Sequence, residues 1–146
     1  MLIGEYTHAI DDKNRLSLPV KFRRELGKKI IITPGLDGCL FAFSVKEWER
    51  IANGLTAGEG SMLQSDNRGF NRRMFGGATE AQVDTIGRVL IPEFLKKIAD
   101  LSGKVAVVGV QNRLEIWSEK NWKNYREVVE KKADALAEKL GQIGVL

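Results

Sequence analysis

The sequence VDTIGRVLIP at residues 83–92 decides the fold, because the same pattern stands earlier in the chain as IDDKNRLSLP at residues 10–19. Each copy has an apolar residue, Asp, two free positions, a turn residue and Arg, followed by alternating residues that end in Pro. The similarity begins upstream of both segments and continues downstream until Trp48 aligns with Trp122. The pattern indicates one supersecondary unit that occurs twice in the chain.

Length and composition limit what such a duplicated chain can be. At 146 residues it is one ordinary domain, or two modules too small to bury a full core separately, so we expect two halves that share a core. Apolar residues at 43% and charged residues at 29% are typical of a globular protein. One Cys and one His exclude an intrachain disulfide framework and leave too few ligands for a zinc site, so no metal or cofactor is expected.

The N-terminal sequence lacks the features of a signal peptide, and no apolar run approaches the length that spans a membrane. We therefore expect a cytoplasmic protein without a membrane partner. The net charge of +4 is unevenly distributed, because the segment 13–29 opposes many basic residues with Glu25 alone. These basic residues are Lys13, Arg15, Lys21, Arg23, Arg24, Lys28 and Lys29. Such a run is typical of a polyanion-binding face and also of an ordinary solvated surface.

Each copy of the pattern predicts a hairpin. Residues 4–11 alternate with the period of a half-buried strand, and turn residues follow as far as Asn14. Asn14 and Gly87 occupy the same turn position, since Asn tolerates the left-handed backbone that Gly adopts freely. The hairpin in the first copy then has Lys13 at its tip, and Arg15 starts the return strand.

The elements after the hairpins also occur in pairs. Pro19 and Pro92 each open a short helix, and each helix is followed by two β-rich runs joined by a turn. Ser44 and Ser118 are candidate N-caps of longer helices. A helix is also expected within the connecting segment. The predicted units are a first repeat at 1–53, a connecting segment at 54–76, a second repeat at 77–121 and a C-terminal helix at 122–146.

The C-terminal helix has a clear apolar stripe at spacings of three and four residues. The stripe consists of Trp122, Tyr125, Val129, Ala133, Leu136 and Leu140. It must pack against either the body of its own chain or a neighbouring subunit.

Two interpretations fit the paired Asp-x-x-(Gly/Asn)-Arg segments. Arg15 can form a salt bridge back to Asp11, and Arg88 to Asp84, so that each pair stabilises its own turn. Alternatively, each guanidinium extends from a rigid turn toward phosphates or guanine edges, which its planar set of donors fits well. The two interpretations are compatible, because an Asp can hold an Arg in the orientation that such a contact needs.

The doubled Asp-x-x-x-Arg motif, the strands that end in Pro, the Glu-Ile-Trp at 115–117 and the charged C-terminal helix resemble the MraZ family of bacterial transcriptional regulators. The resemblance covers nearly the whole chain. It implies an α+β fold: a tandem-repeat, AbrB-like swapped-hairpin β-barrel with flanking short helices and a long C-terminal helix. The residues that match the family motif are Asp11, Arg15, Asp84, Gly87 and Arg88, whereas Asn14 stands where Gly is usual.

The same resemblance implies ring-like homo-oligomers associated with the nucleoid. These bind short direct repeats in double-stranded DNA upstream of the division and cell-wall gene cluster, usually as a repressor. The candidate DNA-binding residues are Arg15, Arg88, Lys13, Lys21, Arg23 and Arg24, of which the last three lie on or beside the first short helix and can also simply face water.

No catalytic residue and no small-molecule substrate are evident. His8 and Cys39 both fall within apolar strand patterns, which favours packed side chains over a base or a nucleophile. Two alternatives to DNA binding remain open. One is a structural homo-oligomer whose charged loops contact other subunits, and the other is a small-barrel enzyme with carboxylate or Lys chemistry that a sequence does not reveal.

Overall fold

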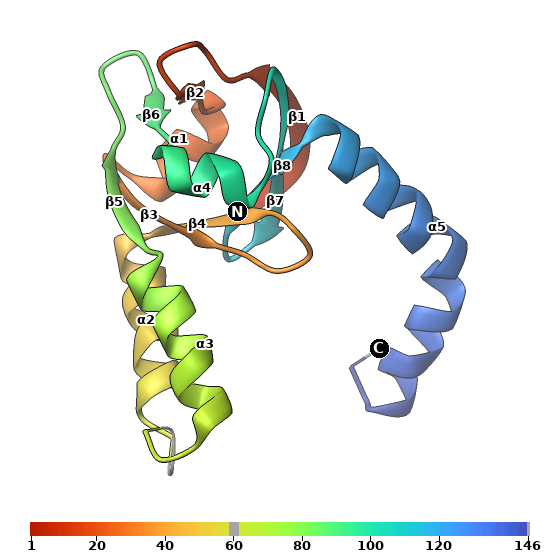
Figure 1. Cartoon of the computed structure of the whole chain (residues 1–146). Coiled ribbons are helices and arrows are strands. Elements are labelled where there is room, and N and C mark those ends of the chain that lie inside the picture. The colour runs from red at the N-terminus through yellow and green to blue at the C-terminus, as the bar shows by residue number, and fades with distance from the viewer. Residues whose placement is uncertain (59–61, 146) are drawn as a thin grey trace.

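The structure is a computed structural model that describes residues 1–58 and 62–145, so residues 59–61 of the expected connecting segment and residue 146 lie outside the description. The chain is α+β, and its two halves follow the same order of strand, strand, short helix, strand, strand and long helix (Figure 1). The strands are β1 Leu2–Ala9, β2 Arg15–Ser17, β3 Lys29–Pro34, β4 Leu40–Ser44, β5 Thr79–Gln82, β6 Arg88–Leu90, β7 Lys104–Gln111 and β8 Leu114–Ser118. The helices are α1 Val20–Leu26, α2 Val45–Thr56, α3 Ser65–Gly76, α4 Glu93–Ile98 and α5 Glu119–Gln142.

The two halves exchange their first strands. All pairs in the main sheet are antiparallel, in the order β1-β7-β8-β4-β3-β5, so β1 of the first half pairs with β7 of the second, and β5 of the second pairs with β3 of the first. The register is the same on both sides: His8 lies opposite Val105, and the equivalent Ala81 lies opposite Ile30. The swapped pairing expected from the family resemblance is therefore confirmed.

The expected closure into a barrel is wrong. Strands β2 and β6 form a separate two-stranded sheet, and within the described residues the edge strands β1 and β5 of the six-stranded sheet do not pair with each other. The hairpin expected in each copy is also wrong beyond its turn, because each of these strands pairs with a strand of the other half. Among the described residues, β1 and β2 are joined only by the bridge between Ile10 and Leu16. Pro19 and Pro92 follow the two short strands closely, and a proline has no N–H for a ladder. The ladder therefore stops instead of running round to close.

The two halves share one core, as the length of the chain predicts. The short helices α1 and α4 place Phe22 and Leu95 inside it, both 0% exposed. Strands from both halves supply the rest, including Ile30 from β3 and Ile116 from β8, which are also 0% exposed. Since each half contributes to the same cluster, neither half buries its apolar face without the other.

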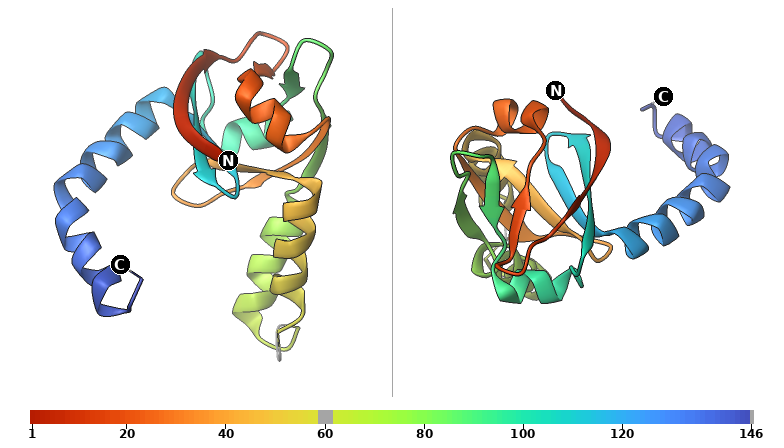
Figure 2. Two further views of the ribbon diagram at one scale, coloured as in Figure 1. Left: turned by 180° about the vertical axis from the view of Figure 1, so that it is seen from behind. Right: turned by 90° about the horizontal axis from the view of Figure 1, so that it is seen from above.

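Helices α2 and α3 lie side by side and project from the sheet as a hairpin (Figures 1 and 2). The N-cap expected at Ser44 is confirmed, because its Oγ accepts a hydrogen bond from the N–H of Glu47 at 3.2 Å. Trp48 joins the two helices to the sheet, since its ring lies 5.9 Å from that of Phe43 and 5.5 Å from that of Phe75. The expected helix in the connecting segment is therefore a packed part of the molecule.

Helix α5 leaves the opposite side of the sheet as a separate arm (Figure 2). Its first turns are anchored by aromatic contacts, with the ring of Trp117 5.4 Å from that of Trp122 and 5.0 Å from that of Tyr125. Farther along, Leu136 and Leu140 are each 40% exposed, and no residue of the helix is fully buried. The apolar stripe thus packs on its own chain only near its start. Among the described residues, no helix is long and apolar enough to cross a membrane.

Cys39 is a buried thiol, 1% exposed, whose S–H donates a hydrogen bond to the carbonyl of Leu36 at 3.2 Å. Burial raises its pKa to about 12, so the reactive thiolate is nearly absent at neutral pH. We expect Ellman's reagent to leave the native protein unmodified at neutral pH and to react with one thiol per chain after unfolding in guanidinium chloride. Rapid stoichiometric reaction of the native protein would contradict this placement.

Candidate nucleic-acid interface

The loop between β1 and β2 is organised around the carboxylate of Asp11. Its Oδ1 accepts hydrogen bonds from the backbone N–H groups of Lys13 at 2.9 Å and Arg15 at 2.8 Å. Its Oδ2 accepts a third bond, from Nε of Arg15, at 2.8 Å. One side chain therefore fixes both the backbone of the turn and the direction of the arginine.

The loop between β5 and β6 has the same geometry. Oδ1 of Asp84 accepts from the backbone N–H groups of Ile86 at 3.1 Å and Arg88 at 2.8 Å, and Oδ2 accepts from Nε of Arg88 at 2.8 Å. The two segments that the sequence aligns thus form the same loop twice. We call them the Asp–Arg loops, residues 11–15 and 84–88.

Hydrogen bonding keeps both carboxylates ionised. The pKa of Asp11 lies below its ordinary value, mainly because the carboxylate accepts from the backbone N–H of Arg15, and the pKa of Asp84 is lowered in the same way by Arg88. Bonds of this kind favour the charged form of a carboxyl group. At neutral pH each loop therefore retains its ion pair.

The two guanidinium groups are accessible. The side chains of Arg15 and Arg88 are 32% and 29% exposed, so neither is sealed in the core. In each arginine the Nε edge is used by the aspartate, whereas among the described residues nothing binds Nη1 or Nη2. The salt-bridge interpretation is therefore confirmed. Within the described part of the chain, the salt bridge leaves the Nη1 and Nη2 donors of each guanidinium unused.

Each Asp–Arg loop is held by the opposite half of the chain. The N–H of Leu18 donates to the carbonyl of Gly87 at 2.9 Å, and the N–H of Ile91 donates to the carbonyl of Asn14 at 2.8 Å. Asn14 has φ of 60° and Gly87 has φ of 85°, so both turn residues adopt the left-handed backbone that the sequence predicts. Both loops lie at the end of the molecule away from the α2–α3 hairpin (Figure 1).

The remaining candidate residues divide into two groups. Lys13, Lys21 and Arg24 are exposed at the tip of the first loop and on α1. Arg23 differs, because its guanidinium lies against Gly87 in the second loop, and its Nε is buried without a hydrogen-bond partner among the described residues. The structure therefore brings Arg23 next to the turn residue that precedes Arg88.

Two residues that the sequence interpretation missed contact the first loop. Nζ of Lys96 donates to Oδ1 of Asn14 at 2.9 Å, and Nδ2 of Asn14 donates to Oε2 of Glu93 at 2.9 Å. Both residues come from α4, in the other repeat. The signal was available, because aligning the repeats places Lys96 over Arg23.

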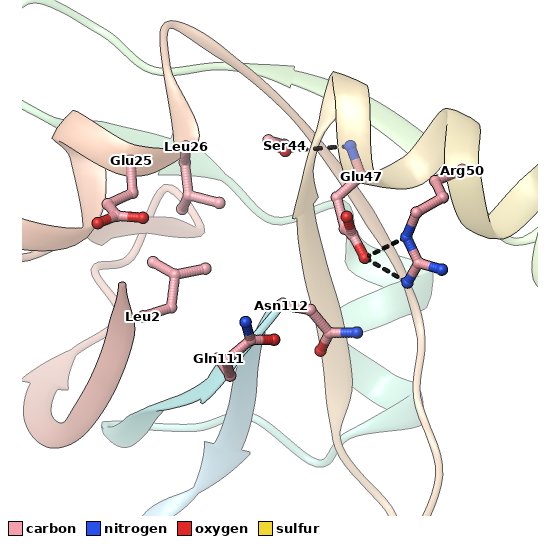
Figure 3. A pocket seen from close by; sticks show the side chains of 8 residues that line it. All are labelled: Leu2, Glu25, Leu26, Ser44, Glu47, Arg50, Gln111 and Asn112. Carbon is pink, nitrogen blue, oxygen red and sulfur yellow. Dashed lines mark hydrogen bonds and ion pairs between the residues drawn. The ribbon is translucent and has the colours of Figure 1, made fainter.

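One cavity contains several ionisable side chains, as the active site of an enzyme would. It has a volume of about 350 Å³ and is lined by residues from both repeats, namely Leu2, Glu25, Leu26, Ser44, Glu47, Arg50, Gln111 and Asn112. Figure 3 shows Glu47 joined to Arg50, with Glu25 across the cavity, and the Glu47–Arg50 ion pair measures 2.6 Å. The hydrogen bond from Arg50 lowers the pKa of Glu47, which is the opposite of what a general acid needs.

Glu25 in the same cavity pairs with the amino group of Met1. Within residues 1–58 and 62–145, no group of three or more His, Cys, Asp or Glu side chains is arranged to hold a metal ion. The ionisable groups of this cavity are therefore held in charged pairs.

A strand-swapped tandem repeat that presents the same Asp–Arg loop twice defines the class of protein. In comparison with known families, the model of the family described as MraZ protein matches this chain twice, at residues 1–73 and 74–141. "Transcriptional regulator MraZ" from Caldicellulosiruptor saccharolyticus is 44% identical over 145 residues, covering 99% of this chain and 100% of that protein. The protein of the same name from Clostridium botulinum is 42% identical with the same coverage, and that from Moorella thermoacetica is 44% identical over 96% of each chain.

The chain belongs to the MraZ family. These relatives are named as transcriptional regulators and not as enzymes, and the chain is accordingly a transcriptional regulator.

Proposed function

We propose that the chain is a sequence-specific DNA-binding repressor that acts as a ring-like homo-oligomer on short direct repeats upstream of its own gene in the division and cell-wall gene cluster. Its partner is double-stranded DNA of the nucleoid, in the cytoplasm. The observation that carries the proposal is the pair of Asp–Arg loops, in which Arg15 and Arg88 are oriented through Nε, with Nη1 and Nη2 unused among the described residues.

An arginine held in this way suits DNA for a physical reason. The outer edge of a guanidinium presents parallel donors that match O6 and N7 of guanine or two phosphate oxygens. Its bond to the aspartate already restricts the side chain, so less conformational entropy is lost on binding. Asp11 and Asp84 therefore serve the proposed contact although they carry the wrong charge to touch DNA themselves.

Exposed basic residues near the loops support a contact with the DNA backbone. Lys13 lies at the tip of the first loop, and Lys21 and Arg24 are exposed on α1. Contacts to phosphates fix the position of a protein on the duplex and carry little sequence information. We assign these three residues that role, and we assign base reading to Arg15 and Arg88.

Assembly completes the mechanism, because one loop reaches very few bases. Several subunits that engage spaced repeats together raise the overall affinity far above that of one subunit. The exposed apolar positions of α5, including Leu136 and Leu140, support assembly through a neighbouring subunit. The direct repeats proposed as the operator fit a contact that is repeated once per subunit.

Binding to DNA from just upstream of the chain's own gene tests the proposal. We expect tight binding that weakens steeply with added salt, by about 0.9 in the logarithm of the affinity per tenfold salt for each phosphate contacted. Fluorescence anisotropy at several salt concentrations measures this, with a scrambled duplex of equal length as control. Equal affinity for the two duplexes would reduce the interaction to charge attraction and contradict the proposal.

A further inference from the structure

Arg23 occupies the space where residue 87 would carry a side chain. A Cβ built on Gly87 would collide with Nη1, Cζ and Nε of the Arg23 guanidinium, with Nε at 2.5 Å. Three atoms of one planar group lie close to the same point, so the guanidinium covers the turn with its face. Glycine at this position thus does two things: it adopts φ of 85°, and it makes room for an arginine of the other repeat.

The equivalent place in the first loop is filled in a different way. There the turn residue is Asn14, and the facing residue is Lys96, whose Nζ donates to Oδ1 of Asn14 at 2.9 Å. Asn14 also donates to Glu93 at 2.9 Å. The residue of α1 that aligns with Glu93 is Val20, whose side chain offers no hydrogen-bond acceptor. One loop therefore pairs a small turn residue with a flat cation, and the other pairs a hydrogen-bonding turn residue with a slender cation.

We propose that Arg23 and Lys96 are positioning residues for DNA binding, each of which sets the Asp–Arg loop of the opposite repeat and is matched to the turn residue that it faces. The inference rests on the proposed function, since it concerns how Arg88 and Arg15 are aimed at DNA. Arg23 is thereby assigned to supporting the second loop, and Lys96 to supporting the first.

The matching has a mechanical consequence. An arginine side chain is flexible, so an asparagine at position 87 would push the Arg23 guanidinium aside without unfolding the protein, and asparagine tolerates a positive φ. The Arg23 guanidinium would then no longer cover the loop, and the Arg88 side chain would no longer be held in one direction. A lysine at position 23 would leave room for that asparagine and would donate to it, as Lys96 donates to Asn14.

Four variants of the full chain test this: Gly87→Asn, Arg23→Lys, the two together, and Gly38→Asn as the matched control. Gly38 has nearly the same φ, 88°, in a tight turn in which the N–H of Cys39 donates to the carbonyl of Leu36. Nothing lies within 4 Å of its Cβ position, so its replacement measures backbone strain alone. The measurements are affinity for the upstream duplex, the midpoint of thermal unfolding, and amide hydrogen exchange at residues 84–88.

We expect Gly87→Asn to weaken DNA binding about tenfold, within the range for losing one base-contacting arginine. Its unfolding midpoint should match that of Gly38→Asn, which should bind like the wild type. The double variant should regain most of the lost affinity and of the hydrogen-exchange protection at residues 84–88. Since one of the two hydrogen bonds of Asn14 has no counterpart at Val20, we expect the recovery to be incomplete.

Two results would overturn the inference. One is a Gly87→Asn variant that binds DNA and protects its loop like the wild type. The other is a double variant whose fold-loss of DNA affinity equals the product of the fold-losses of Gly87→Asn and Arg23→Lys. Such a result would mean that positions 23 and 87 are not coupled. If the wild type itself fails to bind the upstream duplex, the proposed function fails. In that case the hydrogen exchange of the same variants still decides whether positions 23 and 87 are coupled.

Discussion

Replacing Arg15 and Arg88 together by alanine is expected to weaken binding to the upstream duplex by at least about a hundredfold. The loss of an arginine that contacts a base costs roughly 1–3 kcal/mol, and each chain loses two. In an oligomer the loss recurs in every subunit that touches DNA, so the measured effect should exceed that of one chain. Fluorescence anisotropy measures the affinity, and light scattering measures the size of the assembly in the same samples.

Arg113→Ala provides the matched control for this experiment. Arg113 also pairs with a carboxylate, Glu115, at 2.9 Å, and its side chain is 27% exposed, close to the exposure of the two loop arginines. It belongs to neither Asp–Arg loop, so its loss should leave DNA affinity nearly unchanged. If the double variant keeps its affinity with its fold intact, the assignment of Arg15 and Arg88 is wrong. If it instead falls apart into smaller species, the charged loops serve assembly, as the structural-oligomer alternative holds.

Replacing Phe22 by alanine is expected to lower the free energy of unfolding by about 3–5 kcal/mol. Phe22 is 0% exposed in the shared core, and its ring meets that of Tyr6 edge to face at 5.2 Å. Removal of the ring leaves a cavity between the two halves, which close packing cannot refill. Against a typical total stability of about 5–15 kcal/mol, the loss is large. Urea denaturation followed by circular dichroism measures it.

Phe94→Ala is the control for the core variant, because the same ring is removed from the other short helix. Phe94 is 48% exposed, so its loss should cost no more than about 0.5 kcal/mol in the isolated chain. Similar losses in the two variants would mean that α1 and α4 do not present the faces described.

Most of the fold follows from the repeated pattern in the sequence. The alternation predicts a strand on each side of the two turns, although not the partners of these strands, and Asn14 and Gly87 are recognisable as one turn position because few residues accept a positive φ. Ser44 and Ser118 mark the starts of α2 and α5, where each side chain accepts the expected N-cap bond. These features depend on neighbours in sequence, so local chemistry specifies them.

The parts that the sequence left open depend on contacts between distant residues. The apolar pattern of α4 includes Phe94, Leu95 and Ile98, yet only Leu95 is buried, while Phe94 and Ile98 are 48% and 45% exposed. A helix of six residues is too short for periodicity to define one face. The expectation of a closed barrel was wrong for a related reason, since β2 and β6 pair with each other in a separate sheet, and this pairing joins residues far apart in the sequence.

The contacts of the short helices α1 and α4 with the loop of the opposite repeat were also beyond local reasoning. Asn14 and Lys96 stand far apart in the sequence, so alignment of the repeats indicates Lys96 as the equivalent of Arg23 but does not predict its bond to Asn14. The Asp–Arg pairs were foreseen because the partners stand four residues apart, within reach across one turn.

The exchange of strands between the halves has a consequence for how such a regulator can change over time. In a protein made from two identical chains, every alteration of a loop would appear in both partners at once. Here both Asp–Arg loops belong to one chain, so each has its own sequence. The two loops differ at the turn position, with asparagine in one and glycine in the other. A single subunit can thereby present two different loops to its target, and selection can change one loop while the other keeps its contact.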